Sequence, residues 1–151
     1  MILIIDFGSQ YNQLIARRVR ECKVYCQIEP PNVSIEQIRA IKPEGIILSG
    51  GPSSIYEKKS PRMDPAVFDL DVPILGICYG MQFMIDALGG TVKQARKREY
   101  GFAELQIQRA EGIFEEIKPR TQCWMSHGDS IEQLPKGFQV TAATDNTPFA
   151  A

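Results

Sequence analysis

The sequence has few of the residues and patterns that mark several common protein classes. Its 151 residues include one histidine and four cysteines, at positions 22, 26, 78 and 123, without the paired spacing of a zinc site. Seventeen basic residues nearly balance eighteen acidic ones, so no overall field attracts nucleic acid or a membrane. No apolar run reaches the roughly 18 residues that span a bilayer. Neither a G-x-G-x-x-G sequence nor a P-loop occurs, which argues against a nucleotide-binding module.

The composition is typical of a globular protein. Hydrophobic residues make up 44% and charged residues 23%, and the length suits one domain with a core of its own. The opening apolar run ends at Asp6, with no basic segment before it, unlike a secretory signal. We therefore expect a cytoplasmic protein with reduced thiols.

Apolar runs and helical patterns alternate along the first ninety residues. Continuous apolar runs predict buried strands, the alternating segment 23–28 predicts a further strand, and helical spacing predicts the helices between them. This order indicates an α/β fold with an open, mostly parallel sheet and helices on both faces. The predicted strands are 2–6, 23–28, 45–48 and 73–77, and the predicted helices are 10–21 after a Ser9 cap, 34–40 with a Ser34 cap, 65–68 and 80–88.

The pattern changes after Gly89-Gly90. Segments 102–108 and 122–125 show more polar alternation, which predicts antiparallel strands, and 138–142 predicts one further strand. The basic cluster from Lys93 to Arg98 is interrupted by Gln94 and Ala95. It is therefore interpreted as a solvated loop face and not as a binding patch.

A cysteine between two glycines follows the predicted strand 73–77. The sequence Gly76-Ile77-Cys78-Tyr79-Gly80 has the spacing of a nucleophile elbow, in which a strand delivers the nucleophile to a strained turn and a helix leaves at once. The N-terminus of that helix favours a thiolate and an oxyanion. A core cysteine in a tight turn is the alternative, and this motif alone does not separate the two.

The segment Ser49-Gly50-Gly51-Pro52 follows the neighbouring strand 45–48. Loops at the carboxyl ends of adjacent parallel strands face the same crevice, so this loop is predicted to lie beside Cys78. Its glycines let backbone N–H groups approach a substrate oxygen. By itself the segment is also typical of a plain turn; together with the elbow, it predicts an oxyanion loop.

Four stretches spread over most of the chain carry a family resemblance. They are DFGSQY (6–11), LSGGPSSIY (48–56), GICYGMQ (76–82) and WMSHGD (124–129). Together they resemble the class I glutamine amidotransferase domain, which has a flavodoxin-like fold. The first stretch, the SSIY extension and the SHGD segment favour the branch found in glutamine-hydrolysing GMP synthetases over the relatives that serve carbamoyl phosphate or anthranilate.

The resemblance implies a reaction and a set of residues. Glutamine would be hydrolysed to glutamate and ammonia through a thioester on Cys78, and the ammonia would convert XMP to GMP with ATP. The backbone N–H groups of Gly51 and Tyr79 would form the oxyanion hole. No cofactor is implied for this domain; ATP and Mg²⁺ are implied for a partner, the ATP pyrophosphatase (synthetase) domain. The residues implied to bind substrate are Gln82, Ser126, Gly128 and Asp129.

The chain also departs from the family pattern. A His-Pro-Glu motif completes the family's site, and neither it nor the pyrophosphatase domain occurs within residues 1–151. We therefore expect 1–151 to be a glutaminase domain that lacks its C-terminal part, including the triad histidine and glutamate, and is inactive alone. The alternatives are a glutamine-binding or partner-docking fragment without turnover, and a glutaminase subunit of another amidotransferase.

His127 is the residue most easily mistaken for the catalytic base. His127-Gly128-Asp129 imitates the spacing of His-Pro-Glu, and it is the sole histidine in the chain. The resemblance places the catalytic histidine in a later segment, so His127 is predicted not to be the base. Without the resemblance, Ser-His-Gly-Asp predicts a turn that ends in a capping Asp129.

Overall fold

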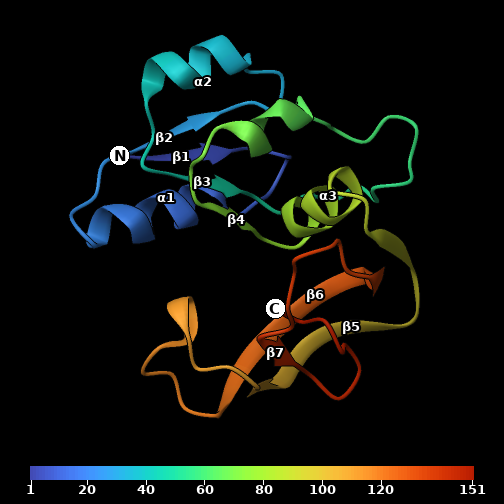
Figure 1. The fold of residues 1–151 in the computed structure, drawn as a ribbon. Coiled ribbons are helices and arrows are strands. Elements are labelled where there is room, and N and C mark those ends of the chain that lie inside the picture. The colour runs from blue at the N-terminus through green and yellow to red at the C-terminus, as the bar shows by residue number, and fades with distance from the viewer. The chain divides into compact units, whose positions relative to one another are not determined.

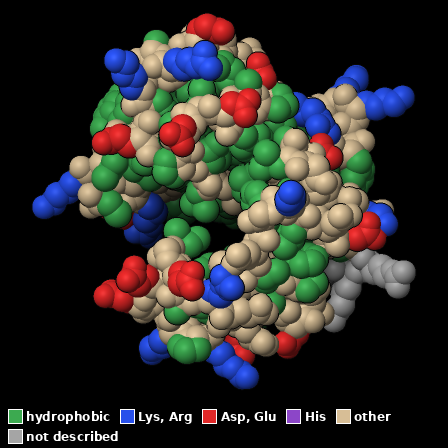
Figure 2. All heavy atoms as spheres, viewed as in Figure 1, with side chains coloured by type: hydrophobic (Ala, Val, Ile, Leu, Met, Phe, Trp, Pro, Cys, Tyr) green, Lys and Arg blue, Asp and Glu red, His purple; other side chains and the backbone are tan. Residues whose placement is uncertain are grey.

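The chain forms two compact units, Met1–Ala87 and Leu88–Ala151, in a computed structural model (Figure 1). The structure describes residues 1–95 and 100–151 in full. Figure 2 shows acidic and basic side chains interspersed on the viewed face, without a large block of either sign. Within the described residues, no helix is long and apolar enough to cross a membrane.

The first unit is built on a four-stranded sheet with the order β2-β1-β3-β4. Every pair of neighbouring strands is parallel, with Ile4 opposite Ile28 on one side and Ile47 on the other. The sheet therefore has the parallel topology that the sequence predicts. Its strands are β1 (Ile2–Ile5), β2 (Cys26–Glu29), β3 (Gly45–Leu48) and β4 (Ile74–Gly76).

Helices cover both faces of this sheet. α1 (Asn12–Glu21) and α2 (Ile35–Ile41) lie on opposite faces in Figure 1. On the α1 face, Ile4, Ala16 and Cys26 form a buried cluster. Because side chains alternate along a strand, the fully buried Leu3 and Ile5 project to the other face. The α/β fold class predicted from the sequence is confirmed.

The start and the buried face of α1 differ from the prediction. Ser9 does not cap the helix; its Oγ accepts a hydrogen bond from the Tyr11 N–H at 3.0 Å, and the helix begins at Asn12. The buried positions are Asn12 and Ala16, four residues apart, whereas Tyr11 and Leu14 are exposed. Among the described residues, neither atom of the buried Asn12 amide has a hydrogen-bond partner.

The start of α2 agrees with the prediction. The Ser34 hydroxyl accepts from the Gln37 N–H, and the Gln37 side chain accepts from the Ser34 N–H, which together form a capping box. The short helix predicted at 65–68 is the 3₁₀ helix η1 (Pro65–Asp69), whose first turn is capped by the Asp64 carboxylate. The last helix of this unit is α3 (Tyr79–Ala87).

The second unit contains an antiparallel sheet with the order β6-β5-β7. Glu104 pairs with Gln122, and both residues are exposed, whereas the adjacent Ala103 is buried on the other face. This alternation explains the polar pattern that predicted antiparallel strands. The elements are β5 (Thr91–Ile107), the 3₁₀ helix η2 (Gly112–Phe114), β6 (Arg120–Gln133) and β7 (Ala142–Ala143).

Two predictions in this half were wrong. Residues 93–95 lie in β5 and not in a loop, and Lys93 and Gln94 pair with Ser130 and Asp129 of β6. The rest of the basic cluster, up to Arg98, lies outside the fully described residues. The strand predicted at 138–142 is reduced to β7, since only Ala142 and Ala143 pair with β5.

Candidate active site

Cys78 occupies a strained turn between β4 and α3. Its φ angle is +48°, in the left-handed region that a residue with a Cβ adopts only at a cost of order 1–3 kcal/mol. Two backbone hydrogen bonds hold the turn on the end of β3. The Ile77 N–H donates to the Leu48 carbonyl oxygen at 2.9 Å, and the Gly80 N–H donates to the Ser49 carbonyl oxygen at 3.0 Å. This is the geometry of the predicted elbow.

Both glycines of the elbow are required by close packing. A Cβ at Gly76 would lie 2.6 Å from the Cα of Met81, and a Cβ at Gly80 would lie 2.3 Å from the carbonyl oxygen of Leu48. Both distances are shorter than any real Cβ contact, and the obstructing atoms belong to the backbone. The sequence pattern is therefore explained by steric space at these two positions.

The environment of Cys78 does not by itself activate the thiol. The residue is exposed to solvent, yet the atoms packed around it desolvate the thiolate and raise the pKa of the Cys78 thiol above its ordinary value. Within the described residues, desolvation is the one cause of this shift, and no cationic side chain opposes it. The thiol is thus accessible, and it keeps its proton to a higher pH than an ordinary thiol.

The Gly-Gly-Pro loop lies beside Cys78, as the sequence predicts. A Cβ at Gly50 would be 3.5 Å from the Cβ of Cys78. The buried Ser49 holds this loop, because its Oγ accepts from the Phe7 N–H at 3.0 Å and donates to the Gly50 carbonyl oxygen at 2.9 Å. A Cβ at Gly51 would meet the Phe7 carbonyl oxygen at 2.5 Å, so this position also requires glycine.

The two predicted oxyanion donors lie in the two segments that meet at Cys78, the loop after β3 and the start of α3. Gly51 is in the loop after β3, and Tyr79 is the first residue of α3, where the N–H has no acceptor within the helix. Neither N–H donates a backbone hydrogen bond within the described part of the chain. The Tyr79 side chain is anchored, since its hydroxyl donates to the Pro61 carbonyl oxygen at 2.6 Å and its ring lies 5.2 Å from that of Phe7.

Gln82 lies one turn into α3, and its N–H donates to the Cys78 carbonyl oxygen at 3.0 Å. The residue is only 6% exposed. Its side-chain oxygen is buried without a hydrogen-bond partner among the described residues. A buried unpaired acceptor is unfavourable, typically by about 1–3 kcal/mol, which is unusual unless a ligand or water pairs with it.

The predicted substrate residues of the SHGD segment lie in the second unit, on β6. Ser126, Gly128 and Asp129 are strand residues, so the turn predicted from this segment in isolation is wrong. Asp129 is 7% exposed, whereas Ser126 is exposed. The Nδ1–H of His127 donates to the Asp129 carbonyl oxygen at 2.9 Å. Cys78, Gly51, Tyr79 and Gln82 all belong to the first unit.

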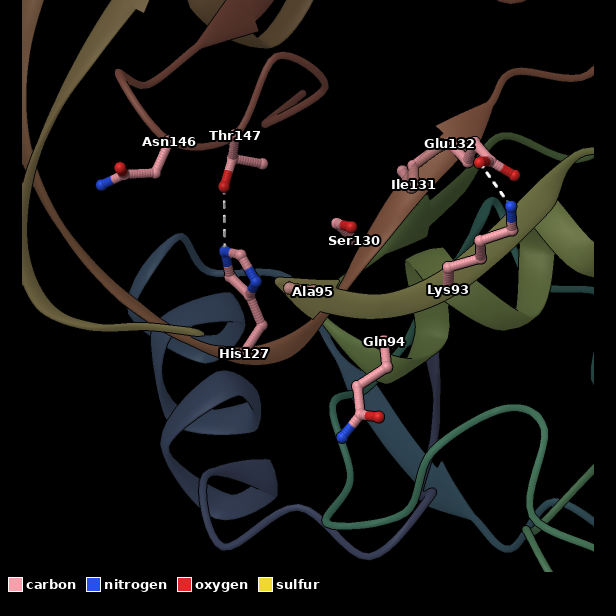
Figure 3. Close-up of a pocket in the computed structure, with 9 residues that line it drawn as sticks. All are labelled: Lys93, Gln94, Ala95, His127, Ser130, Ile131, Glu132, Asn146 and Thr147. Atoms are coloured by element: carbon pink, nitrogen blue, oxygen red, sulfur yellow. Dashed lines mark hydrogen bonds and ion pairs between the residues drawn. The ribbon is translucent and has the colours of Figure 1, made fainter. Parts of the chain in front are cut away.

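A pocket of about 410 Å³ in the second unit is lined by Lys93 and His127 together with Glu132 and Thr147, which the sequence did not single out (Figure 3). Lys93 pairs with Glu132 at 2.5 Å on one side, and the Thr147 hydroxyl lies 3.4 Å from the Nε2 of His127 on the other. These residues come from three separate segments without a shared motif, so no sequence signal predicts their association. No cluster of three or more potential metal ligands occurs in the described residues.

Residues 3–151 match the family described as glutamine amidotransferase class-I. The chain belongs to this family. Two relatives are glutamine-hydrolysing GMP synthases, from Heliobacterium modesticaldum (57% identical over 150 residues) and Brachyspira hyodysenteriae (54% over 150 residues). In each case the match covers 99% of this chain and 29% of the relative. The chain therefore spans less than a third of the length of these relatives.

Solved structures agree with the family assignment. A crystal structure from Thermoplasma acidophilum, described as one subunit of a candidate GMP synthase, aligns with a TM-score of 0.87 and 28% identity over 98% of this chain and 74% of that one. A glutamine amidotransferase from Thermotoga maritima aligns with a TM-score of 0.77 over 97% of this chain and 67% of that one. Its identity is 19%, so it supports the fold alone.

Proposed function

We propose that residues 1–151 act as the glutaminase domain of a glutamine-hydrolysing GMP synthase, a ligase of purine biosynthesis. The observation that carries this proposal is the strained Cys78 turn, seated beside the Gly50–Gly51 loop on the end of β3. Identities of 54–57% to named GMP synthases support this branch of the family over a glutaminase subunit of another amidotransferase.

The chemistry follows from the position of the nucleophile. The Cys78 sulfur, deprotonated by a base, attacks the side-chain carbonyl carbon of glutamine and forms a tetrahedral intermediate. The carbon–nitrogen bond then breaks, ammonia leaves with the proton that the base returns, and a thioester remains. Water hydrolyses the thioester to glutamate and regenerates the thiol. The N–H groups of Gly51 and Tyr79 hold the oxyanion, where one donor is typically worth about 2.7–4 kcal/mol.

Four residues are assigned to substrate binding: Gln82, Ser126, Gly128 and Asp129. The unpaired side-chain oxygen of Gln82 supports a contact with an N–H donor of the substrate glutamine. The carboxylate of Asp129 is assigned to the substrate α-ammonium group, with which it can form a charge-assisted hydrogen bond. Ser126 and Gly128, on the same strand, are assigned to the remaining contacts with the α-amino and α-carboxylate groups.

The base that activates Cys78 is proposed to come from outside residues 1–151, as the histidine of a His–Glu pair. The raised pKa of the Cys78 thiol supports the need for such a base. His127 is not assigned this role, because its ring is engaged with Asp129 and Thr147.

The partner is proposed to be an ATP pyrophosphatase domain or subunit, with ATP and Mg²⁺ bound there, which uses the ammonia to convert XMP to GMP in the cytoplasm. The relatives are more than three times as long as the matched region, which supports this proposal. This domain itself is assigned no cofactor.

Trapping of the thioester tests this function. A polypeptide that contains residues 1–151 and the proposed base is quenched in acid during turnover of radiolabelled glutamine. Radioactive label is expected on the peptide that contains Cys78. The label should be absent in the Cys78→Ala variant and present in the control variant Cys123→Ala. Label that persists in Cys78→Ala would exclude Cys78 as the nucleophile. If the polypeptide is a binding module without turnover, glutamine is expected to bind, but the Cys78 peptide should carry no label and no ammonia should be released.

A further inference from the structure

The imidazole of His127 is held at both ring nitrogens. A carbonyl oxygen only accepts hydrogen bonds, so the 2.9 Å contact with the Asp129 carbonyl oxygen requires the proton on Nδ1. In the neutral ring Nε2 is then an acceptor, and the hydroxyl of Thr147 donates to it at 3.4 Å (Figure 3). This distance is long for a hydrogen bond, so its main effect is on the orientation of the ring.

Thr147 is itself held by a short closed loop. The Thr144 N–H donates to the Thr147 carbonyl oxygen at 2.9 Å, and the Thr147 N–H donates to the Thr144 Oγ1 at 3.0 Å. Both threonines are almost fully buried, at 7% and 6% exposed. The hydroxyl that faces His127 therefore projects from a rigid element, and His127 connects this element to β6.

This connection occurs where the β5–β6 pairing is irregular. Ser126 pairs with Tyr100, whereas Asp129, three residues further along β6, pairs with Gln94, six residues back along β5. A regular ladder would advance equally on both strands. The register of the ladder therefore shifts next to Asp129, and the His127 side chain supplies a contact to the Asp129 carbonyl oxygen at this point.

We propose that His127 and Thr147 are positioning residues for the amino-acid end of the glutamine site. Together they hold the Asp129 backbone so that its buried carboxylate faces the substrate α-ammonium group. The inference rests on the proposed function through the role given to Asp129. It adds a specific protonation state for His127, a role for Thr147, and a reason for the presence of a histidine that does not serve as the base.

The protonation state can be measured without substrate. Because the chain has one histidine, the ring nitrogen signals in a ¹⁵N-labelled sample belong to His127 without ambiguity. At alkaline pH, where an ordinary imidazole is neutral, two-bond ¹H–¹⁵N correlations are expected to show one tautomer, with the proton on Nδ1. A proton on Nε2, or averaging between the two tautomers, would overturn the proposal.

The effect on binding is tested in the Cys78→Ala chain, which cannot react. Thr147→Val keeps the shape of the side chain and removes the hydroxyl, whereas Thr147→Ser keeps the hydroxyl. Thr147→Val is expected to weaken glutamine binding by about threefold to tenfold while the proton stays on Nδ1, because the contact with the Asp129 carbonyl oxygen remains, and Thr147→Ser is expected to restore the affinity. Glutaramate, which is glutamine without its α-amino group, is expected to bind equally to all three chains.

The outcomes distinguish the two proposals. Equal weakening for glutamine and glutaramate, or no weakening for glutamine, would overturn the positioning role and leave the glutaminase assignment intact. A different outcome is that the chain with Thr147 intact shows the fixed Nδ1–H tautomer but binds no glutamine. This result would overturn the substrate role of Asp129, and this inference with it.

Discussion

Gly80 packs directly on the backbone of Leu48, so closely that a Cβ would lie 2.3 Å from the Leu48 carbonyl oxygen. The same oxygen accepts the hydrogen bond from the N–H of Ile77, on the other side of Cys78. The position of the Cys78 turn is therefore set by contacts between backbone atoms of β3 and the elbow, and not by flexible side chains. These contacts explain how the Cys78 turn and the Gly50 loop keep fixed positions relative to each other.

Gly80→Ala is expected to lower the free energy of unfolding by about 1–3 kcal/mol or more, because the new methyl group meets a backbone atom that cannot move away. Chemical denaturation measures this change. The matched control is Gly45→Ala, whose Cβ would meet the terminal methyl of the Ile2 side chain at 2.9 Å, a group that can rotate. Equal losses in both variants would contradict the tight seating of the elbow.

Alkylation of Cys78 is expected to depend strongly on pH. Since desolvation raises the pKa of its thiol, the reactive thiolate is scarce at neutral pH, and the rate should rise about tenfold per pH unit to beyond the ordinary thiol value of about 8.5. Iodoacetamide labelling with peptide mapping measures the rate at Cys78. A rate that reaches its plateau near neutral pH would show that a cationic group lowers this pKa.

A glutamine-mimicking electrophile adds selectivity to this reactivity. It is expected to label Cys78 in preference to Cys22, Cys26 and Cys123, because the elbow presents Cys78 at the proposed glutamine site. The labels are counted by mass spectrometry of tryptic peptides, with free glutamine as competitor. Equal labelling of all four cysteines, unaffected by glutamine, would argue against the site.

Gln82→Met is expected to separate stability from binding. The substitution removes a buried acceptor that has no partner among the described residues, so the free energy of unfolding should stay the same or rise by about 1–2 kcal/mol. Affinity for glutamine in the Cys78→Ala chain should fall, because the proposed contact is lost. Thermal unfolding and calorimetric titration measure the two effects. A stable variant with unchanged affinity would remove Gln82 from the proposed site.

Residues 1–151 alone are expected to release ammonia from glutamine at a negligible rate, at least about a thousandfold below an active glutaminase, because the Cys78 thiol is not activated by the described residues. A coupled ammonia assay measures turnover, with Cys78→Ala as the blank. Near-normal turnover would place the base within this chain. His127→Ala would then be the first variant to test, and a loss of kcat at constant KM would make His127 the base.

The elbow and the parallel sheet could be predicted from the sequence, because their causes are local. The glycines at 76 and 80, two residues either side of Cys78, reflect a steric requirement that the structure confirms. Ser34 and Gln37, three residues apart, form the capping box with no help from distant segments. Continuous apolar runs separated by helices indicate a sheet covered on both faces wherever they occur.

Other features depend on contacts between segments far apart in the chain. The SHGD segment is typical of a turn in isolation, yet pairing with β5 holds it in a strand. The buried stripe of α1 contains Asn12 because the packing of the helix on β1 and β2 selects that face, although Tyr11 and Leu14 are more apolar. The contact between His127 and Thr147 joins residues twenty positions apart. Local patterns thus determined the turn that carries Cys78. Strand pairing decided which side chains surround Asp129, and helix packing decided which face of α1 is buried. Both depend on distances between segments, which no single segment specifies.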